Sequence, residues 1–250
     1  MPLAIPIFLR VPTAIMTRQI RVRPPPFIFR ISLNSNPDIS FAPDGSAALQ
    51  LDDISCTRGG RTLFTGLTQQ LGAGELLRVS GANGAGKTSL LRMVCGLLEP
   101  AAGQVLWRGQ KLSKQRALFG AELVYVGHGA ALKDELSPLE NLLDACALGG
   151  RACSAPPALQ ALRDAGLRSY ERTPARGLSQ GQRRRSTLAR LALSQAAPLW
   201  VLDEPFNALD TVATAWLTSL IEAHLHAGGL VLLTSHQDVP INAAAKVLAL

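Results

Sequence analysis

Residues 81–88 read GANGAGKT, and this octapeptide decides which kind of fold the chain can have. It matches the pattern G-x-x-x-x-G-K-[ST], in which a glycine-rich loop joins a strand to a helix. Residues 74–81, GELLRVSG, contain a short apolar run typical of a strand, and residues 88–98, TSLLRMVCGLL, have helical spacing. The octapeptide therefore stands in the strand–loop–helix context that a phosphate-binding loop requires, and this context disfavours a glycine-rich turn without a ligand.

The chemistry of this loop follows from its residue types. Its glycines can adopt backbone conformations that a Cβ would forbid, so that successive amide groups converge on an anion near the positive end of the following helix. Lys87 supplies a positive charge for the outer phosphates, and the Thr88 hydroxyl can bind Mg²⁺. The residues predicted to bind the nucleotide here are Gly81, Ala82, Asn83, Gly84, Ala85, Gly86, Lys87, Thr88 and Ser89.

Other apolar segments predict the sheet around this loop. Residues 123–127 (LVYVG), 199–204 (LWVLDE) and 230–235 (LVLLTS) are short, nearly continuous apolar runs, which suit strands buried on both faces of a parallel sheet. Residues 48–55, ALQLDDIS, alternate in polarity and predict an edge strand. Residues 137–148, SPLENLLDACAL, predict a helix whose first turn is closed by a capping box between Ser137 and Glu140. These patterns favour an α/β fold.

Two acidic residues follow the second of these apolar runs. Asp203 and Glu204 stand at the carboxyl end of a predicted buried strand, where open α/β sheets place ligand-binding groups. Asp203 is the candidate for holding Mg²⁺, and Glu204 for orienting or deprotonating an attacking water. A solvated turn is the alternative, and the phosphate loop upstream disfavours it.

Composition argues against a generally basic body that binds anionic partners, a zinc or redox cysteine site and a membrane-spanning chain. The formal net charge is +7, but residues 1–37 hold five arginines and no acid, so that without them the charge falls to +2. The four cysteines, Cys56, Cys95, Cys146 and Cys153, lack the spacing of a zinc site or a redox pair, which favours reduced thiols. No stretch approaches the ~20 apolar residues needed to cross a bilayer, so a transport role would require a separate membrane-spanning chain.

Residues 1–46 differ from the rest of the chain. They are rich in Pro and Arg and lack periodicity, and the PPP at 24–26 is incompatible with a helix interior. Three interpretations remain open: a disordered or spurious extension, an organelle-targeting segment, and a functional basic arm. Residues 47–250 are predicted to form the folded domain.

A more specific pattern lies further along the chain. LSQGQ at residues 178–182 resembles the signature motif of ABC-type ATPases, and the segment RRRSTLARLAL after it resembles the helix that follows in that family. NALD at residues 207–210 resembles the D-loop, and His236 in TSH resembles the switch histidine. The resemblance runs from about residue 48 to the end. It implies an ABC-type P-loop NTPase with a mixed sheet core, an antiparallel β subdomain and a helical subdomain at about residues 132–180.

The resemblance also implies roles for these motifs. In the family, the signature faces the ATP held by the phosphate loop of the opposite subunit, which implies a homodimer with ATP and Mg²⁺ at each of two shared sites. The signature residues that would act in this way are Leu178, Ser179, Gln180, Gly181 and Gln182. Glu204 and His236 would be the catalytic pair. Arg183, Arg184 and Arg185 are then expected to be exposed or to face an interface rather than to bind nucleic acid.

Two positions depart from the family pattern. Arg58 stands where an aromatic residue stacks on adenine, and a guanidinium plane can still stack on a base while burying less apolar area. His128, in YVGHGAAL, occupies the position of the Q-loop glutamine and could contact a water bound to Mg²⁺. His224 and His226 are two residues apart on a predicted helix, which indicates surface residues rather than a metal or haem site.

Several phrases resemble one branch of this family, the CcmA family of haem exporter ATPases in cytochrome c biogenesis. They are RTLFTGL, NGAGKTSLLRMVCGLLEPAAGQVLWRGQ and the Gly127–His128 pair followed by SPLENL. The resemblance implies a peripheral subunit on the cytoplasmic face of the cell inner membrane, docked on a CcmB-like integral membrane permease and without a nucleic-acid partner. An ABC ATPase of iron–sulfur cluster assembly is the main alternative. A nucleic-acid-acting ABC protein and a P-loop kinase fit less well, because the former usually carries two cassettes and the latter lacks LSQGQ.

Overall fold

The structure is a computed structural model that describes residues 48–236 and 240–250. The prediction for residues 1–46 lies outside the described residues. The strands are β1 (Leu49–Arg58), β2 (Arg61–Leu71), β3 (Leu76–Ser80), β4 (Ala102–Trp107), β5 (Gln110–Lys111), β6 (Leu123–Val126), β7 (Leu199–Leu202), β8 (Leu230–Thr234) and β9 (Ala245–Ala249). The helices are α1 (Lys87–Val94), α2 (Arg116–Glu122), α3 (Pro138–Leu148), α4 (Ala155–Asp164), α5 (Gln180–Leu188) and α6 (Thr211–His226), with short 3₁₀ turns η1 (Leu112–Lys114), η2 (Ala175–Gly177) and η3 (Ala189–Leu193).

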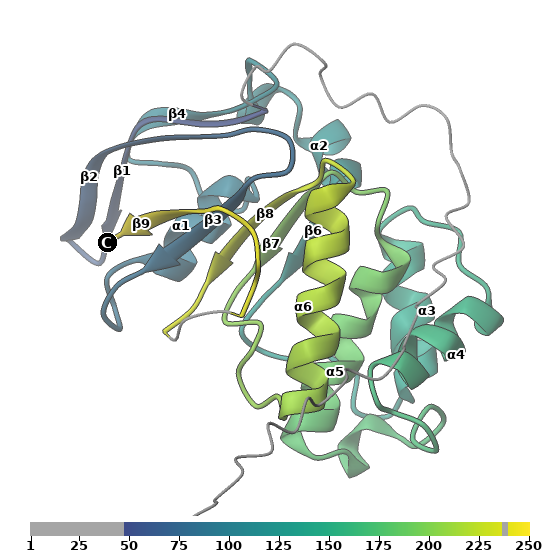
Figure 1. Ribbon diagram of the computed structural model, residues 1–250. Helices are drawn as coiled ribbons and strands as arrows, with labels where there is room; N and C mark the ends of the chain where they lie inside the picture. Colours follow the sequence, from purple (N-terminus) through teal and green to yellow (C-terminus); the bar gives the residue numbers. More distant parts are fainter. Residues whose placement is uncertain (1–47, 237–239) are drawn as a thin grey trace, which may run out of the picture. The chain divides into compact units, whose positions relative to one another are not determined.

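Two sheets organise these elements. One has five parallel strands in the order β6-β7-β8-β3-β9, and the other has four antiparallel strands in the order β2-β1-β4-β5 (Figure 1). The expected parallel and antiparallel strands are thus present as two separate sheets. The prediction of an edge position for residues 48–55 is wrong, because β1 pairs with both β2 and β4. Its alternating polarity comes from an antiparallel sheet with one face in solvent.

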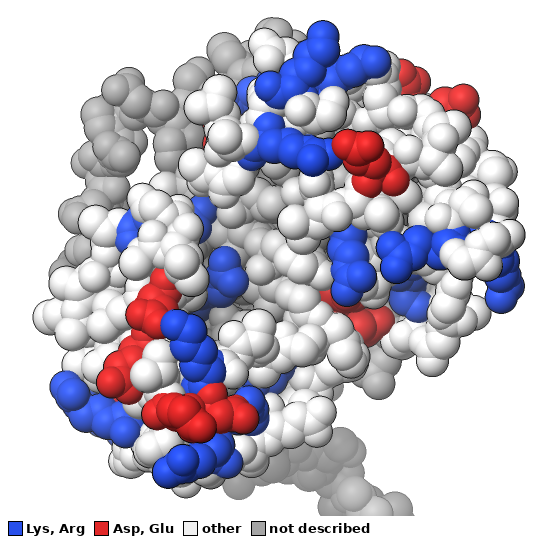
Figure 2. Space-filling model, turned by 180° about the vertical axis from the view of Figure 1, so that it is seen from behind, with Lys and Arg blue, Asp and Glu red and all other residues white. Residues whose placement is uncertain are grey.

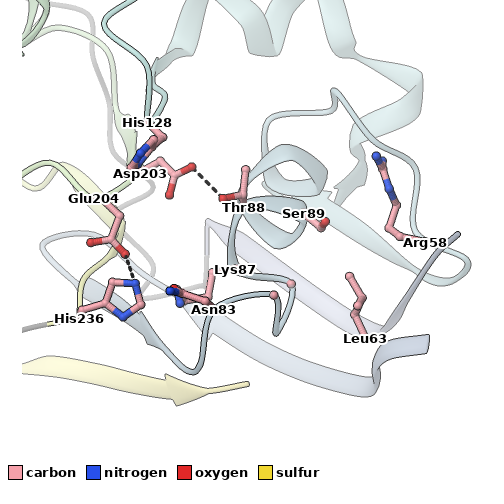
Figure 3. Close-up of a pocket in the computed structure, with 12 residues that line it drawn as sticks. Arg58, Leu63, Asn83, Lys87, Thr88, Ser89, His128, Asp203, Glu204 and His236 are labelled. Atoms are coloured by element: carbon pink, nitrogen blue, oxygen red, sulfur yellow. Dashed lines mark hydrogen bonds and ion pairs between the residues drawn. The ribbon is translucent and has the colours of Figure 1, made fainter. Parts of the chain in front are cut away.

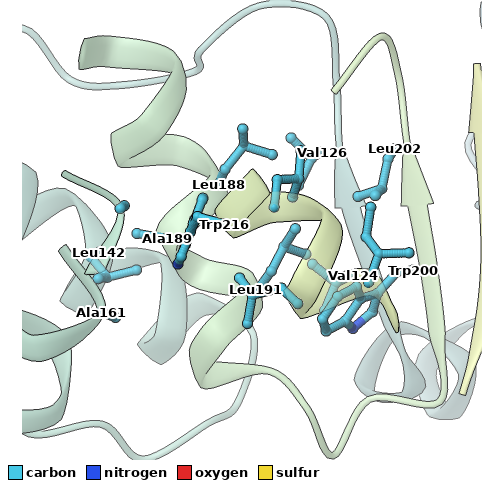
Figure 4. Close-up of a cluster of buried hydrophobic side chains, with 14 of the residues drawn as sticks. Val124, Val126, Leu142, Ala161, Leu188, Ala189, Leu191, Trp200, Leu202 and Trp216 are labelled. Carbon is cyan, nitrogen blue, oxygen red and sulfur yellow. The ribbon is translucent and has the colours of Figure 1, made fainter. Parts of the chain in front are cut away.

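The central strands β7 and β8 are buried at every position because both faces of the sheet are covered there. In β7, Leu199 and Val201 pack in a cluster with α1 and the antiparallel sheet, whereas Trp200 and Leu202 pack against α3–α6. Figure 4 shows this second cluster, in which Trp200 of β7 lies among side chains of the neighbouring strand and helices. Each strand of this kind therefore contributes to two cores at once.

Local signals fix the start of two helices. α3 begins with the predicted capping box: Ser137 Oγ accepts a hydrogen bond from the Glu140 amide at 3.3 Å, and the Glu140 carboxylate accepts one from the Ser137 amide at 2.8 Å. α5 begins with a second box, between Ser179 and Gln182. Because each box satisfies amide groups that the first turn leaves unpaired, both helices start at defined residues.

Charged side chains are interspersed on the surface. On the face shown in Figure 2, Lys and Arg stand in several separate groups with Asp and Glu beside several of them. Ion pairs of the described surface include Arg116–Glu99 at 2.6 Å and Lys133–Asp144 at 2.8 Å. The charges of this face therefore do not form one continuous basic surface. No helix in the described ranges has the length and apolar character needed to span a membrane.

The expectation that His224 lies on the surface is wrong. Its side chain is 1% exposed and its ring stacks on Trp200, with ring centroids 3.9 Å apart and planes 3° from parallel. His226, two residues later, is exposed as expected. α6 packs its inner face against β7, and the ring fills the space above Gly229, where a Cβ would collide with it. Burial lowers the pKa of His224 to about 4.

We expect this buried ring to make the protein less stable in acid. The unfolded chain takes up a proton at His224 near the ordinary value of 6.5, whereas the folded chain does so only near 4. Stability from this group is therefore complete above pH 6.5 and declines as the pH falls toward 4, by roughly 3 kcal/mol. His224→Phe keeps an aromatic ring at this position and should remove the pH-dependent part of the stability that comes from His224. Urea unfolding at several pH values measures it, with His226→Gln as the control, and an unchanged pH dependence in His224→Phe would contradict the assignment.

Candidate functional site

The phosphate loop lies between β3 and α1, and its conformation depends on glycine. Gly81, Gly84 and Gly86 all have positive φ, at 147°, 82° and 109°. A Cβ at Gly86 would lie 3.1 Å from the ring of Phe64, so the loop also packs tightly against the antiparallel sheet. Lys87 opens α1, is 8% exposed, and donates hydrogen bonds to the carbonyls of Gly81 at 2.7 Å and Ala82 at 3.1 Å. The ammonium group is therefore held inside the loop.

A single cavity of about 380 Å³ gathers most of the predicted site residues (Figure 3). It is lined by Arg58, Leu63, Asn83, Gly84, Gly86, Lys87, Thr88, Ser89, His128, Asp203, Glu204 and His236. The acidic residues and His128 lie at one end, and Arg58 and Leu63 lie at the other (Figure 3). The acidic end suits phosphates accompanied by a cation and is called the phosphate end, whereas a base could pack at the other end.

Oxygen atoms at the acidic end fit a magnesium ion. Thr88 Oγ1 donates a hydrogen bond to Asp203 Oδ2 at 3.0 Å, which places a hydroxyl and a carboxylate together beside the loop. Mg²⁺ prefers such oxygen ligands and keeps several waters. His128 points toward the same place (Figure 3), and because imidazole nitrogen is not a ligand that Mg²⁺ favours, its ring suits contact with a bound water. Within the described part of the chain, no cluster of three or more His, Cys, Asp or Glu side chains forms another metal site.

Glu204 is held in an unusual backbone conformation. It is 7% exposed and has a φ of 49°, in the left-handed region that non-glycine residues rarely adopt. Its carboxylate lies 3.2 Å from His236 Nε2. Its amide donates to Thr234 Oγ1 at 2.8 Å, and the same hydroxyl donates to Asp203 Oδ1 at 2.8 Å. One buried hydroxyl on β8 therefore orients both acidic residues.

The signature residues lie at the start of α5. Leu178 is buried, Ser179 is the N-cap and Gln180 is exposed. Gly181 approaches the D-loop so closely that a Cβ would lie 2.9 Å from the Ala208 carbonyl. Among the described residues, none from 178–182 lines the 380 Å³ cavity, whereas Gln180 lines a second cavity of about 770 Å³ with residues 128–132 and 207–208. The structure thus separates the signature from the phosphate loop of the same chain.

The three arginines after the signature have three different environments. Arg183 is partly exposed and pairs with Asp134 at 2.6 Å, and Arg185 is partly exposed and lies 3.8 Å from Asp210. Arg184 contradicts the expectation of an exposed or interface residue, because it is 5% exposed. Its guanidinium donates hydrogen bonds of 2.8 Å to the backbone carbonyls of Gly127, Asp203 and Glu204. The helix turns this one arginine inward, toward the ends of β6 and β7.

Two residues, Thr234 and Arg184, have roles in the structure that the sequence motifs do not predict. Thr234 was seen only as part of a strand, although a hydroxyl at the carboxyl end of a buried strand next to Asp203 is itself a signal. Arg184 was grouped with its neighbours, although it precedes the buried residues Leu188 and Leu191 by four and seven positions. That spacing places it on the buried face of the helix.

Comparisons with known proteins agree with this geometry. The sequence profile of the family described as "ABC transporter" matches residues 64–207. A cytochrome c biogenesis ATP-binding export protein, CcmA, from Dechloromonas aromatica is 50% identical over 195 residues, which is 78% of this chain and 95% of the relative. The CcmA protein of Methylococcus capsulatus is 49% identical over 204 residues, covering 82% of this chain and 98% of the relative.

Solved structures share the fold. An ATP-binding subunit of an ABC transporter matches with a TM-score of 0.67 and 24% identity, covering 76% of this chain and 79% of the other. An ATP-binding cassette described as dimeric, in a post-hydrolysis state and bound to ADP and Pi, matches with a TM-score of 0.63 and 24% identity, covering 76% of this chain and 88% of the other.

The double hydrogen bond of Thr234 makes a testable prediction. Thr234→Val keeps the shape of the side chain but leaves the buried Glu204 amide without a partner, which should lower the free energy of unfolding by about 1–3 kcal/mol. Thr234→Ser retains the hydroxyl, so its free energy of unfolding should fall by less than that of Thr234→Val. Urea denaturation of the three proteins measures the difference. Equal stability of the Val and Ser variants would show that the hydroxyl does not hold the Glu204 backbone.

Proposed function

The chain belongs to the ABC transporter family, and on this premise we propose that it is the ATP-hydrolysing subunit of an exporter that serves cytochrome c biogenesis. The observation that carries the proposal is its 50% and 49% identity to two CcmA proteins over nearly their whole length, together with one cavity that holds Lys87, Asp203, Glu204 and His236. Haem is the cargo that the CcmA resemblance implies. An ATPase of iron–sulfur cluster assembly is not favoured, because these relatives are named as export proteins.

The phosphate end of the cavity suggests how ATP is bound. Amide groups of residues 81–88 surround the phosphates near the start of α1, and Lys87 exchanges its contacts with Gly81 and Ala82 for phosphate oxygens. Thr88 and Asp203 would hold Mg²⁺, and His128 would contact a water bound to it. When bound, the ion neutralises charge that develops on the phosphates. Arg58 stacks on the base and Leu63 packs beside it, at the far end of the cavity.

Hydrolysis requires a water aligned with the terminal phosphate. Glu204 is the group we assign to orient and deprotonate this water, because its carboxylate is in the cavity and its backbone is fixed on both sides. His236, 3.2 Å from that carboxylate, contacts the terminal phosphate and limits the directions in which Glu204 can point. Both residues act on the reacting atoms, so we assign both as catalytic.

A complete site needs a second copy of the chain. The signature residues lie outside the phosphate cavity of their own chain, and the N-terminal end of α5, with Ser179 and Gly181, provides amide groups suited to an anion. In a twofold dimer each signature faces the ATP of the partner, giving two equivalent sites. ATP binding then closes the dimer and hydrolysis reopens it.

The movement of dimer closure has to be transmitted to a membrane partner. We propose that this partner is a CcmB-like permease, on which the chain docks at the cytoplasmic face of the inner membrane. The segment after His128 is tied to two helices: Thr187 of α5 donates a hydrogen bond to the Ala130 carbonyl at 2.6 Å, and Asn141 of α3 bonds to the Lys133 backbone. A displacement at His128 would therefore move the surface formed by residues 128–132 and α3. We propose that the permease docks there.

Replacement of the proposed base tests the dimer. Glu204→Gln cannot take up the water proton, so with ATP and Mg²⁺ it should accumulate as a closed dimer, measured by gel filtration with light scattering. Ser179→Arg in the same background introduces bulk at the signature and should restore the monomer. A Glu204→Gln protein that stays monomeric at saturating ATP would contradict the shared site.

Purification from solubilised membranes tests the transport assignment. We expect the tagged chain to bring with it one integral membrane protein, and to leave the membrane fraction when that protein is deleted. Loss of the chain should lower the level of haem-containing cytochrome c. A chain that instead copurifies with scaffold proteins of iron–sulfur assembly, in cells with normal cytochrome c, would favour the alternative.

A further inference from the structure

The buried guanidinium of Arg184 joins three separate segments. Arg184 belongs to α5, Gly127 follows β6, and Asp203 and Glu204 follow β7. Three backbone carbonyls accept hydrogen bonds of 2.8 Å from it, and the His128 carbonyl lies 3.4 Å away. A buried charge is costly unless hydrogen-bonded, so these contacts have to be kept together. The planar fork of arginine can bridge carbonyls in this way, whereas the single ammonium of lysine cannot reproduce its geometry.

Two hydrogen bonds, one from each side, fix the peptide groups around Glu204. Thr234 accepts a hydrogen bond from the Glu204 amide, and Arg184 donates one to its carbonyl, both at 2.8 Å. The residue between these two contacts has the left-handed φ of 49°. Because such a conformation persists only where its surroundings enforce it, the direction of the Glu204 carboxylate depends on both partners. One of them, Arg184, is on the same helix as the signature.

We propose that Arg184 is a positioning residue for hydrolysis, which links the signature helix to the backbone of Glu204 and of the His128 segment. The inference rests on the proposed ATPase function and goes beyond it by naming the link inside one subunit. When α5 shifts on dimer closure, the guanidinium carries the movement to the carbonyls of Asp203 and Glu204. The base is then aligned only when the signature is engaged.

The neighbouring arginine provides a matched comparison. Arg185 follows on the same helix and carries the same charge, but its contacts are the Gly166 carbonyl at 3.4 Å and Asp210 at 3.8 Å, and its side chain is 20% exposed. In these contacts Arg185 touches neither Asp203 and Glu204 nor the His128 segment. If charge or helix packing alone mattered, substitutions at Arg184 and at Arg185 would both lower the rate of hydrolysis. If the link matters, only substitution of Arg184 lowers it.

Steady-state ATP hydrolysis by the full chain tests the proposal. Arg184→Lys should lower kcat at least about tenfold with KM changed less than about threefold, because the link acts on the aligned base rather than on ATP binding. Arg184→Gln should lower kcat further. Arg185→Lys should keep kcat within about twofold of wild type. Urea unfolding and binding of a fluorescent ATP analogue show that each variant is folded and binds nucleotide.

A double-mutant cycle separates positioning from a merely structural role. If Arg184 acts through Glu204, then Arg184→Lys should lower the residual rate of Glu204→Gln by less than about twofold, since residues that act as one unit are not additive. The rate is measured with radiolabelled ATP. An unchanged kcat in folded Arg184→Lys, a loss that lies wholly in KM, or fully multiplicative losses in the double variant would each overturn the proposal. Absence of hydrolysis by the wild-type chain would instead refute the proposed function.

Discussion

A buried positive charge that must be surrounded by carbonyl oxygens constrains the site more than any other interaction. Arg184 is 5% exposed, and its guanidinium keeps its three 2.8 Å hydrogen bonds only if the ends of β6 and β7 and the first turns of α5 meet at one point. These are the segments that carry His128, the acidic pair and the signature. Three motifs far apart in the sequence thus share one set of hydrogen bonds, and a change in one requires an adjustment in the others.

The rest of the site extends from this point through short polar contacts. Thr234 links Glu204 to Asp203, Asp203 accepts from Thr88, and Thr88 lies in α1 directly after the phosphate loop. This chain of contacts therefore connects α5, the end of β7, β8 and α1, and so reaches the phosphate loop. Apart from Arg184, its members are short side chains or backbone groups, which lose little conformational entropy when they are ordered. The long basic side chains Lys87 and Arg58 line the cavity, where a ligand can contact them.

Much of the fold could be predicted because its signals are local. The strand–loop–helix around residues 81–88, the apolar strands and the Ser137 capping box each depend on neighbouring residues and are present in the structure. The errors concern residues whose environment is set by distant partners. Arg184 and His224 look like surface residues in a polar sequence context, yet carbonyls of remote strands and the face of Trp200 receive them. Likewise, the alternation in β1 indicates one solvated face but cannot reveal the number of its neighbours.

The same geometry explains why one chain can hold the reacting groups without completing the site. The phosphate loop and the acidic pair are fixed in one cavity, while the signature is fixed beside the D-loop by the close approach of Gly181 to Ala208. Both arrangements depend on glycine, since each glycine permits a contact that a Cβ would prevent. We propose that the signature, which lies outside the phosphate cavity of its own chain, acts on the ATP of a second molecule. On the proposed function, this separation leaves the isolated subunit incomplete, and we therefore expect hydrolysis to depend on pairing.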